Sequence, residues 1–449
     1  MIELTKEYIE NLKQVIDNKD DEKAKDLLRD LYPADVAELF QELDTQETIY
    51  FYSLMDDEKA ADALMELDDD ERNKLLKKLP IEMIAKRFVD NMDTDDAVDL
   101  MRGLDEDVQE EILSHIEDVE QAGDIIDLLR YDEDTAGGLM GTEMIVVNEN
   151  WSMPQCIEEM RRQAEEIDEI YYVYVVDDDE RLRGVLPLKE MITSPSISKI
   201  RHVMQKDPIS VREDDSLEEV AQVMEKYDLV AIPVIDSIGR LVGRITVDDV
   251  MEEVREQHER DYQLASGISQ DVESSDNVFQ QTAARLPWLL IGMIGGLGNS
   301  MLLGGYESGI AANPKMALFI PLIGGTGGNV GIQSSAIVVQ GLANNSLKAS
   351  NVLPQVIKES VVALINASMI SLIVFLYNYF TLGDRAITAS VSLSLFAVVM
   401  FASIFGTIVP MTLNKMKIDP ALATGPFITI TNDIIGMMIY MTIAYYLIS

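Results

Sequence analysis

The chain has 449 residues, more than one compact domain usually holds, and 79 acidic against 36 basic side chains give a net charge of −43. This excess of carboxylates excludes nucleic acid as a partner and favours cations, because binding a polyanion depends on Lys and Arg. From Arg285 to the C-terminus the chain has only 7 basic and 5 acidic residues. Such a low density of charge is typical of a segment dissolved in lipid.

Residues 1–135 are predicted to form an acidic α-helical domain. Apolar residues recur at helical spacing, without the alternation of a strand. Short segments such as LYPADVAELFQEL and MDTDDAVDLMRGL repeat an order of turn, acidic cap and apolar run. Because one such unit cannot bury its apolar face alone, we expect the short helices to stack as a small superhelix.

Residues 136–200 and 201–254 are two copies of one α/β unit. Each copy follows the order strand, helix, strand, turn, strand, helix, and Gly184 or Gly243 is expected to form the turn between the last two strands. This duplication resembles a tandem CBS pair. Such pairs often bind adenine nucleotides, and Asp236 at a strand end could accept a ribose hydroxyl. No basic cluster for phosphates is present, so ATP binding at the pair stays open.

A charged helix, MEEVREQHERDYQLASGI, follows the second copy and contains no breaker before Gly267. It opens a connecting segment, residues 255–284, that leads to the apolar part of the chain. The simplest interpretation is a solvated linker. Its place between a duplicated sensor and the membrane part favours a role in gating.

The C-terminal region, residues 285–449, is predicted to be a membrane domain of five α-helical spans. Each stretch has about 20 or more apolar residues, which is the length needed to cross a hydrocarbon core of about 30 Å. The spans are expected near residues 286–306, 316–342, 356–380, 387–413 and 422–448. Most basic residues of this region fall on the side of the sensor, which predicts a cytoplasmic N-terminus and an external C-terminus.

A carboxylate, Asp433, is expected near the middle of the fifth span. A charge at that depth costs at least ~3 kcal/mol on insertion scales, and it usually faces water or a partner. Asn329 in the second span and Thr424 in the fifth add oxygen ligands, and the Gly-rich stretch before Asn329 is expected to break the helix and expose carbonyls. A site of carboxylate, amide and carbonyl oxygens suits Mg²⁺.

Two long segments, PLIGGTGGNVGIQSS and DPALATGPFITITNDIIG, together with GYES, resemble the signature segments of the MgtE-type magnesium channels. The resemblance extends over essentially the whole chain. It implies a homodimer with five spans per subunit and a pore on the dimer axis, lined by Asp433, Asn329 and the neighbouring Gly328. Thr424 and Gly425 belong to the same set. Ile332 and Gly425 depart from the family pattern, which leaves selectivity among Mg²⁺, Mn²⁺ and Co²⁺ open.

Acidic side chains are predicted to bind regulatory Mg²⁺. Carboxylates about 4 Å apart repel by roughly 1–4 kcal/mol, so an ion that bridges them would draw their elements together. The resemblance implies that such ions lie between the helical domain, the CBS pair and the connecting helix. The candidate ligands are Asp95, Asp99, Asp228, Asp249, Glu252, Glu256 and Glu259.

The sequence therefore predicts a multi-pass protein of the inner membrane that takes up Mg²⁺ and is inhibited when cytoplasmic Mg²⁺ is abundant. An ion-coupled exchanger of divalent cations is the alternative, because Asp433 could alternate between a proton and a metal ion. An enzyme is not expected: the apolar region has no HExxH pair, and no histidine follows His258.

Overall fold

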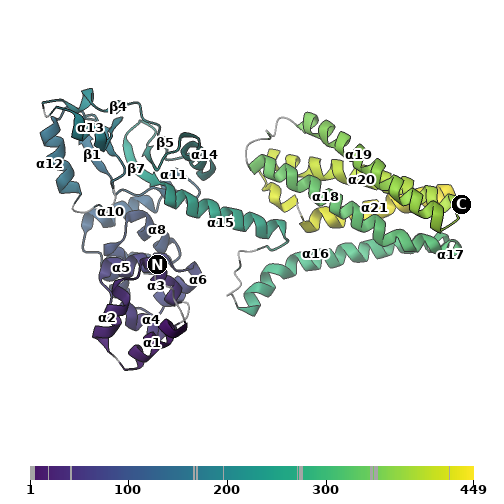
Figure 1. Ribbon diagram of the computed structural model, residues 1–449, viewed down its shortest axis with the longest axis horizontal. Coiled ribbons are helices and arrows are strands. Elements are labelled where there is room, and N and C mark those ends of the chain that lie inside the picture. Colours follow the sequence, from purple (N-terminus) through teal and green to yellow (C-terminus); the bar gives the residue numbers. More distant parts are fainter. Residues whose placement is uncertain are drawn as a thin grey trace. The chain divides into compact units, whose positions relative to one another are not determined.

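The computed structural model describes every residue except 1–5, 19, 41–42, 165–166, 168–169, 196, 270–271, 273–276, 344–346, 348–351, 424 and 449. The chain divides into two compact units, Met1–Val254 and Arg255–Ser449. The first unit combines short helices with two small sheets, and the second is built from long helices (Figure 1).

Short helices form the beginning of the first unit, as predicted. They are α1 (Lys6–Asp17), α2 (Asp21–Arg29), α3 (Pro33–Phe40), α4 (Thr45–Tyr52), α5 (Asp57–Met65), α6 (Asp69–Leu76), α7 (Ile81–Met83), α8 (Thr94–Arg102), α9 (Glu106–Leu113) and α10 (Val119–Leu128), with η1 (Ile84–Phe88) and η2 (Val89–Asn91) before α8. Aspartates begin many of them: the side chains of Asp20, Asp44, Asp56 and Asp118 accept hydrogen bonds from backbone N–H groups of the first turn. These four acidic side chains therefore serve as helix caps.

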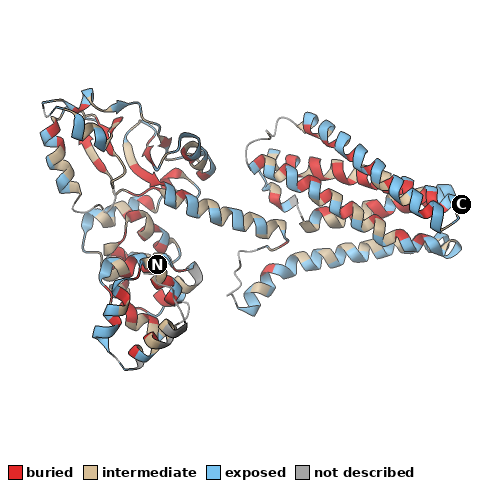
Figure 2. Cartoon of the chain, viewed as in Figure 1, coloured by how far each residue is buried: buried red, intermediate tan, exposed pale blue. Residues whose placement is uncertain are grey.

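Aromatic side chains fill the centre of this helical domain. Tyr52 and Phe88 pack edge to face with their ring centroids 5.4 Å apart, and Phe40 lies 4.8 Å from Tyr52 on the same measure. Buried residues line the inner sides of the helices (Figure 2). Because these helices are too short to be stable alone, packing of this kind holds them.

The CBS pair follows as two α/β copies. The first contains β1 (Ile145–Asn148), α12 (Met153–Gln163), β2 (Val173–Val176), β3 (Leu182–Leu186), α13 (Leu188–Thr193), η3 (Ile200–His202) and β4 (Gln205–Lys206); the second contains β5 (Val211–Arg212), α14 (Leu217–Tyr227), β6 (Ala231–Ile235), β7 (Leu241–Thr246) and the start of α15 (Val247–Ala265). The sheet orders are β1-β2-β3-β4 and β5-β6-β7, and each begins with a parallel pair and continues antiparallel.

The predicted turn glycines are wrong. Gly184 lies inside β3 and Gly243 inside β7, and the turn before β7 instead uses Gly239, whose φ is +87°. Both strand glycines are needed for close approach: a Cβ on Gly184 would lie 2.5 Å from the carbonyl oxygen of Gln205, and one on Gly243 would lie 2.7 Å from the sulfur of Met140. A glycine inside a strand often marks such a contact.

The helical domain shares its hydrophobic core with the second CBS copy, whereas the first copy has a core of its own, with Cys156 fully buried in it. The segment that contains α11 (Ala136–Leu139) also contributes side chains to this shared core. At the end of this segment Gly141 and Arg244 of β7 exchange backbone hydrogen bonds of 2.9 Å in both directions. This pairing places the residues after Gly141 beside the end of β7.

The second unit contains long helices joined by short ones. They are α16 (Val278–Gly304), α17 (Glu307–Ala312), η4 (Pro314–Phe319), α18 (Ile320–Ala343), α19 (Val352–Thr381), α20 (Arg385–Lys415), η6 (Pro420–Ala423) and α21 (Gly425–Ile448). Within the described residues, four are long and apolar enough to cross a membrane: α16, α19, α20 and α21. The α18 helix has 24 residues, about 36 Å at 1.5 Å per residue, so its length suffices, but it is not among those four. The number of five spans stays a prediction.

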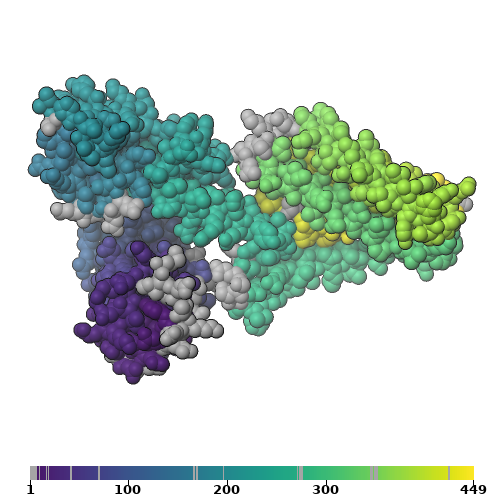
Figure 3. Space-filling model, viewed as in Figure 1, coloured from purple at the N-terminus to yellow at the C-terminus, as the bar shows by residue number. Residues whose placement is uncertain are grey.

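The Gly-rich stretch of α18 does not break the helix, contrary to expectation. Helical structure runs through Gly324–Asn329 without interruption, because the small residues let neighbouring helices approach closely. A Cβ on Gly406 of α20 would lie 2.5 Å from the carbonyl oxygen of Gly331 of α18. Buried residues concentrate on α20, while α16 and α19 expose many apolar side chains. In the space-filling view, little of α21, drawn in yellow, is visible among the green helices (Figure 3).

Candidate metal sites

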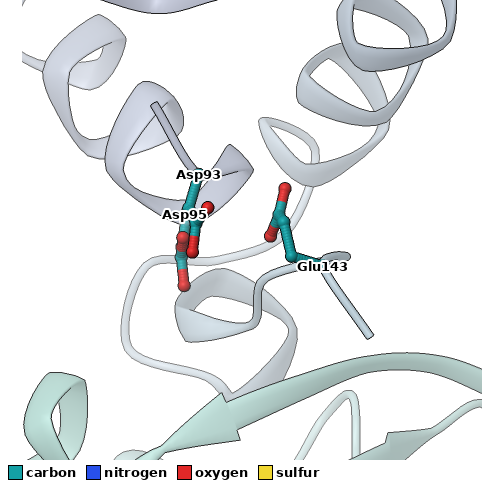
Figure 4. Close-up of side chains that lie close together, drawn as sticks. All are labelled: Asp93, Asp95 and Glu143. Atoms are coloured by element: carbon teal, nitrogen blue, oxygen red, sulfur yellow. The ribbon is translucent and has the colours of Figure 1, made fainter. Parts of the chain in front are cut away.

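Three carboxylates converge in the first unit: Asp93, Asp95 and Glu143 (Figure 4). Each offers an oxygen, and these oxygens all lie within 4.8 Å of one another. Asp93 and Asp95 belong to the start of α8, and Glu143 follows the segment that pairs with β7. We call these three residues the acidic cluster. Carboxylate oxygens at such spacing are the ligands that Mg²⁺ and Ca²⁺ prefer.

Local hydrogen bonds fix the cluster. The backbone N–H of Thr94 donates to Oε1 of Glu143 at 2.9 Å, and the Thr94 hydroxyl donates to Oε2 at 3.2 Å. Gly141 leaves room for the carboxylates, since a Cβ there would lie 2.7 Å from Oδ2 of Asp95 and 2.9 Å from Oε2 of Glu143. Glu143 is therefore held by the first turn of α8, where a helix favours negative charge.

Burial and nearby negative charge raise the pKa values of aspartates in this region. Burial, followed by the nearby charge of Asp249, raises the pKa of Asp95 well above its usual value. The same causes in the same order raise the pKa of Asp96 to about 7. Like charges in a half-buried place cannot all ionise at low cost. A divalent cation would relieve this repulsion.

One positive side chain enters the cluster. Arg244 is 7% exposed, its Nη2 lies 3.6 Å from Oδ2 of Asp93, and its Nε donates to the carbonyl oxygen of Glu143. Its guanidinium also lies over the ring of Tyr171, 5.7 Å from the centroid. The cluster therefore has one fixed cation against several carboxylates.

Only some of the predicted regulatory residues of the first unit come together. Asp95 and Asp249 come together, and Asp249 accepts hydrogen bonds from the N–H and hydroxyl of Thr246. Asp99 is instead paired with Arg102 at 3.2 Å, and burial, its largest cause, raises its pKa to about 6. Asp228 is exposed in a left-handed conformation at the end of α14.

The remaining three predicted ligands lie along α15. Glu252 is exposed at its start, Glu256 pairs with Arg260 at 3.3 Å, and Glu259 is exposed. Glu256 and Glu259 belong to the second unit, and their part in a regulatory site stays a prediction. The sequence analysis missed Asp93 and Glu143. Asp93 lies two residues before the named candidate Asp95. Glu143 gave no signal in the sequence, because only the folded chain brings it to α8.

A pocket of about 290 Å³ lies in the second unit and has Asp433 in its wall. Oδ1 of Asp433 is close to the glycine face of α18: it lies 3.4 Å from a Cβ built on Gly324 and 3.7 Å from one on Gly328. The pocket is lined by Asn299, Ile320, Pro321, Gly324, Gly325, Gly328, Asn329, Thr429, Asp433 and Met437. Its polar groups are one carboxylate, two amides, a hydroxyl and the backbone of a Gly-rich helix.

Three of the five predicted pore residues, Asp433, Asn329 and Gly328, line this pocket. Thr424 lies outside the described residues. Gly425 begins α21 with a φ of +51° and does not line the pocket; a Cβ on it would lie 2.3 Å from the carbonyl oxygen of Ala265. Its glycine thus allows the end of α15 to approach α21.

The sequence analysis missed Asn299 of α16. Its Oδ1 is buried and has no hydrogen-bond partner among the described residues. A buried amide oxygen without a partner is costly and is suited to a ligand or water. The asparagine follows glycines in the sequence GGLGNS. Such glycines are also typical of helix packing, so the sequence did not identify Asn299 as a site residue.

Asp236, the predicted ribose acceptor, is occupied by its own turn. Oδ1 accepts the N–H groups of Ile238 at 3.0 Å and Arg240 at 2.8 Å, and Oδ2 accepts Nε of Arg240 at 2.8 Å. These bonds shape the turn between β6 and β7. The role of Asp236 as a free ribose acceptor is therefore not supported.

Family models match most of the chain. Residues 320–443 match a divalent cation transporter model, residues 31–134 an MgtE intracellular N domain, and residues 136–196 and 200–256 CBS domains. The magnesium transporter MgtE of Thermus thermophilus is 30% identical over 441 residues, 97% of each chain. That of Enterococcus faecalis is 33% identical over 326 residues, 72% of each chain.

A solved structure matches the first part of the chain. It is the cytosolic domain of the Mg²⁺ channel MgtE in complex with ATP, with 31% identity and a TM-score of 0.51, and the match covers 55% of this chain and 99% of that one. Over the matched residues, the fold of this chain is thus similar to that of the cytosolic domain.

Proposed function

The chain belongs to the MgtE family of magnesium transporters, and on that basis we propose that Mg²⁺ crosses the membrane through the pocket beside Asp433. The family consists of transporters and not of enzymes. The observation that supports this path is the approach of Asp433 Oδ1 to the glycine face of α18, with Asn329 and Asn299 in the same wall. The carboxylate attracts the cation, and the amides contact its water shell.

The size of the pocket supports passage of a hydrated ion. Mg²⁺ gives up water reluctantly and keeps octahedral geometry. Six waters at about 30 Å³ each need roughly 180 Å³, and the pocket has about 290 Å³. One carboxylate with neutral amides therefore holds the hydrated ion without removing its water, which permits release.

Flux of Mg²⁺ into liposomes tests the path. We expect Asp433→Asn to abolish uptake, while Asp384→Asn, which changes a helix-capping aspartate of the same unit outside the pocket, leaves uptake intact. Unchanged uptake in Asp433→Asn would place the path elsewhere. The assay is then repeated with and without an imposed proton gradient. Mg²⁺ uptake through a channel does not depend on the proton gradient, whereas uptake by a proton-coupled exchanger does.

Regulation is the second part of the proposal: cytoplasmic Mg²⁺ binds at Asp93, Asp95 and Glu143, with Asp249 alongside. The residues fit a divalent cation, since they supply close oxygens and excess negative charge. The bound ion would screen the repulsion between the start of α8 and the start of α15, and so stiffen the first unit. Loss of the ion at low Mg²⁺ would loosen it and favour transport.

The regulatory site is tested by measuring Mg²⁺ uptake against the Mg²⁺ concentration on the cytoplasmic side. In Asp95→Asn and Glu143→Gln we expect inhibition to require several-fold more Mg²⁺. The matched control is Asp214→Asn, an exposed aspartate that is not a predicted ligand and lies far from the cluster in sequence. If Asp95→Asn and Glu143→Gln gave the same inhibition curve as the control, the proposed site would be contradicted.

ATP binding at the CBS pair is also part of the proposal. It rests on the relative whose cytosolic domain is in complex with ATP, because Asp236 is occupied in this chain. Equilibrium binding of a fluorescent ATP analogue to the full chain tests it. Micromolar binding that unlabelled ATP displaces would support a site, and absence of displacement would reject it.

We further propose that the protein lies in the inner membrane as a homodimer, with its N-terminus in the cytoplasm and its C-terminus outside. The excess of basic residues on one side of the apolar helices supports this orientation. Apolar side chains exposed on α16, among them Leu289, Ile294, Leu297 and Met301, provide a surface for lipid or a second subunit. Native mass spectrometry would test the homodimer, and protease accessibility of each terminus would test the orientation.

A further inference from the structure

A buried carboxylate lies where three helices of the second unit meet. Glu359 of α19 is 8% exposed. Ser334 of α18 donates to its Oε1 at 2.7 Å, and Ser403 of α20 donates to the same oxygen at 2.5 Å. The two hydroxyl oxygens are 2.9 Å apart. Glu359 is not in the pocket wall, so transport through that pocket gives it no direct role.

The position of Ser334 on α18 relates this group to the pocket. Ser334 follows Asn329 by five residues, which corresponds to about 7.5 Å along the helix and a turn of about 140° around it. Between them, the carbonyl of Gly331 meets Gly406 of α20 so closely that a Cβ would be 2.5 Å away. One face of α18 thus lines the pocket, and another is fixed against α19 and α20.

We propose that Glu359 is a positioning residue for the ion path. By binding the hydroxyls of Ser334 and Ser403 on one oxygen, it joins α18, α19 and α20 and sets the rotation of α18. That rotation determines how Gly324, Gly328 and Asn329 face Asp433. The inference rests on the proposed path through the pocket.

The chemistry of the contact explains why an apolar residue would not replace Glu359. A leucine would fill a similar volume, but it would leave two buried hydroxyls without their acceptor, and unpartnered polar groups in apolar surroundings are costly. The helices would shift to satisfy these hydroxyls elsewhere. A glutamine keeps the length of the side chain and an amide oxygen as acceptor, so it retains the contact without the charge.

Mg²⁺ and Co²⁺ uptake by the full chain in liposomes tests the proposal with four variants. Glu359→Leu removes the acceptor, Ser334→Ala with Ser403→Ala removes both donors, and Glu359→Gln retains the acceptor. Ser368→Ala is the matched control, because this exposed serine of α19 bonds only within its own helix, to the carbonyl of Leu364 at 2.7 Å. The amount of monodisperse protein is measured for each, so that uptake is expressed per folded molecule.

We expect the half-saturating Mg²⁺ concentration to rise about tenfold in Glu359→Leu and in the double serine variant, the equivalent of losing about one buried polar contact. Discrimination between Mg²⁺ and Co²⁺ should change in the same two variants. Glu359→Gln should remain close to the parent, and Ser368→Ala should equal it. A purely structural role would lower the yield of folded protein and leave half-saturation and selectivity unchanged.

Two results would overturn the proposal: parental half-saturation in both disrupting variants, or a defect in Glu359→Gln as large as in Glu359→Leu, which would mean that the charge matters and not the bridge. If Glu359→Leu does not fold, the double serine variant decides. Asp433→Asn separates this inference from the proposed path. If that variant transports normally, the path is wrong; if it does not transport and the disrupting variants are normal, only the role of Glu359 fails.

Discussion

Arg244 shows how one residue can set the behaviour of a metal site. It brings a fixed positive charge to within 3.6 Å of Asp93 and binds the carbonyl of Glu143. A metal ion at the acidic cluster must share the carboxylates with this guanidinium. At the proposed site this residue would compete with Mg²⁺, and its contacts with Asp93 and Glu143 would hold the cluster together when Mg²⁺ is scarce.

Replacing this charge should tighten Mg²⁺ binding. In Arg244→Met we expect the Mg²⁺ concentration that gives half of the maximal thermal stabilisation to fall about three- to tenfold, since two unit charges 4 Å apart interact by up to roughly 4 kcal/mol near a protein surface and only part of that is realised. Thermal unfolding across a Mg²⁺ titration measures it. Arg244→Lys keeps the charge and should stay near the parent; a fall in that variant as well would argue that packing and not charge is responsible.

Cys156 allows a prediction about pH. Burial raises the pKa of its thiol to about 11, and the thiolate is the reactive form. At pH 8 about one thiol in a thousand is ionised, so iodoacetamide should label the folded protein very slowly and the denatured protein readily. Because the folded pKa is the higher one, the stability that the neutral thiol contributes is present at pH 8 and is lost as the pH rises through about 9 to 11. Rapid labelling of the folded protein at pH 8 would contradict the burial.

Residues differ in how far the sequence could predict their roles. Asp433 was found because a carboxylate inside an apolar stretch is rare and costly, whatever surrounds it. Asp95 and Asp249 were also named, but Glu143 was missed because its position depends on the pairing of Gly141 with Arg244. Glu359 followed a lysine at the expected end of a span, where a charged residue gives no signal of burial.

At the scale of the elements, the contact between α18 and α20 depends on two glycines. We expect Gly406→Ala to destabilise the second unit by about 1–3 kcal/mol, because its Cβ would lie 2.5 Å from the Gly331 carbonyl and overpacking has costs of this order. Thermal unfolding in detergent measures the change. Gly296→Ala in α16, where nothing lies within 4 Å of a Cβ, is the control; equal stability of the two variants would mean that α20 can move away freely.

Elements with a strong periodic pattern were predicted well, and those that depend on backbone contacts were not. The short helices, the duplicated α/β order and the continuous helix after β7 all followed from local pattern. The Gly-rich stretch of α18 looked like a break, yet it is helical because neighbouring helices compensate for the low helix propensity of glycine. Gly184 and Gly243 were wrongly assigned to turns, because a glycine in a sequence can indicate a turn or a close approach of backbone, and here it allows a close approach.

For the whole molecule, the separation of charge predicts how salts act. Self-repulsion of the acidic part should be screened by NaCl, which raises the unfolding temperature gradually. If Mg²⁺ binds at the acidic cluster as proposed, it should act at millimolar concentrations and well beyond NaCl of equal ionic strength. Calorimetry of the full chain with EDTA, NaCl or MgCl₂ compares them, with Asp95→Asn as the control that loses the additional effect. Equal effects at equal ionic strength would mean that screening alone operates.

The single, fully buried cysteine gives this chain a practical property for spectroscopy. Cysteines introduced at exposed positions would react rapidly with a spin label or fluorophore while buried Cys156 would not, so the native residue need not be replaced. One label in the helical domain and one on an exposed face of α16 would report the distance between the two units directly. The same labelled protein, followed while Mg²⁺ is added, would show whether ion binding in one unit moves the other.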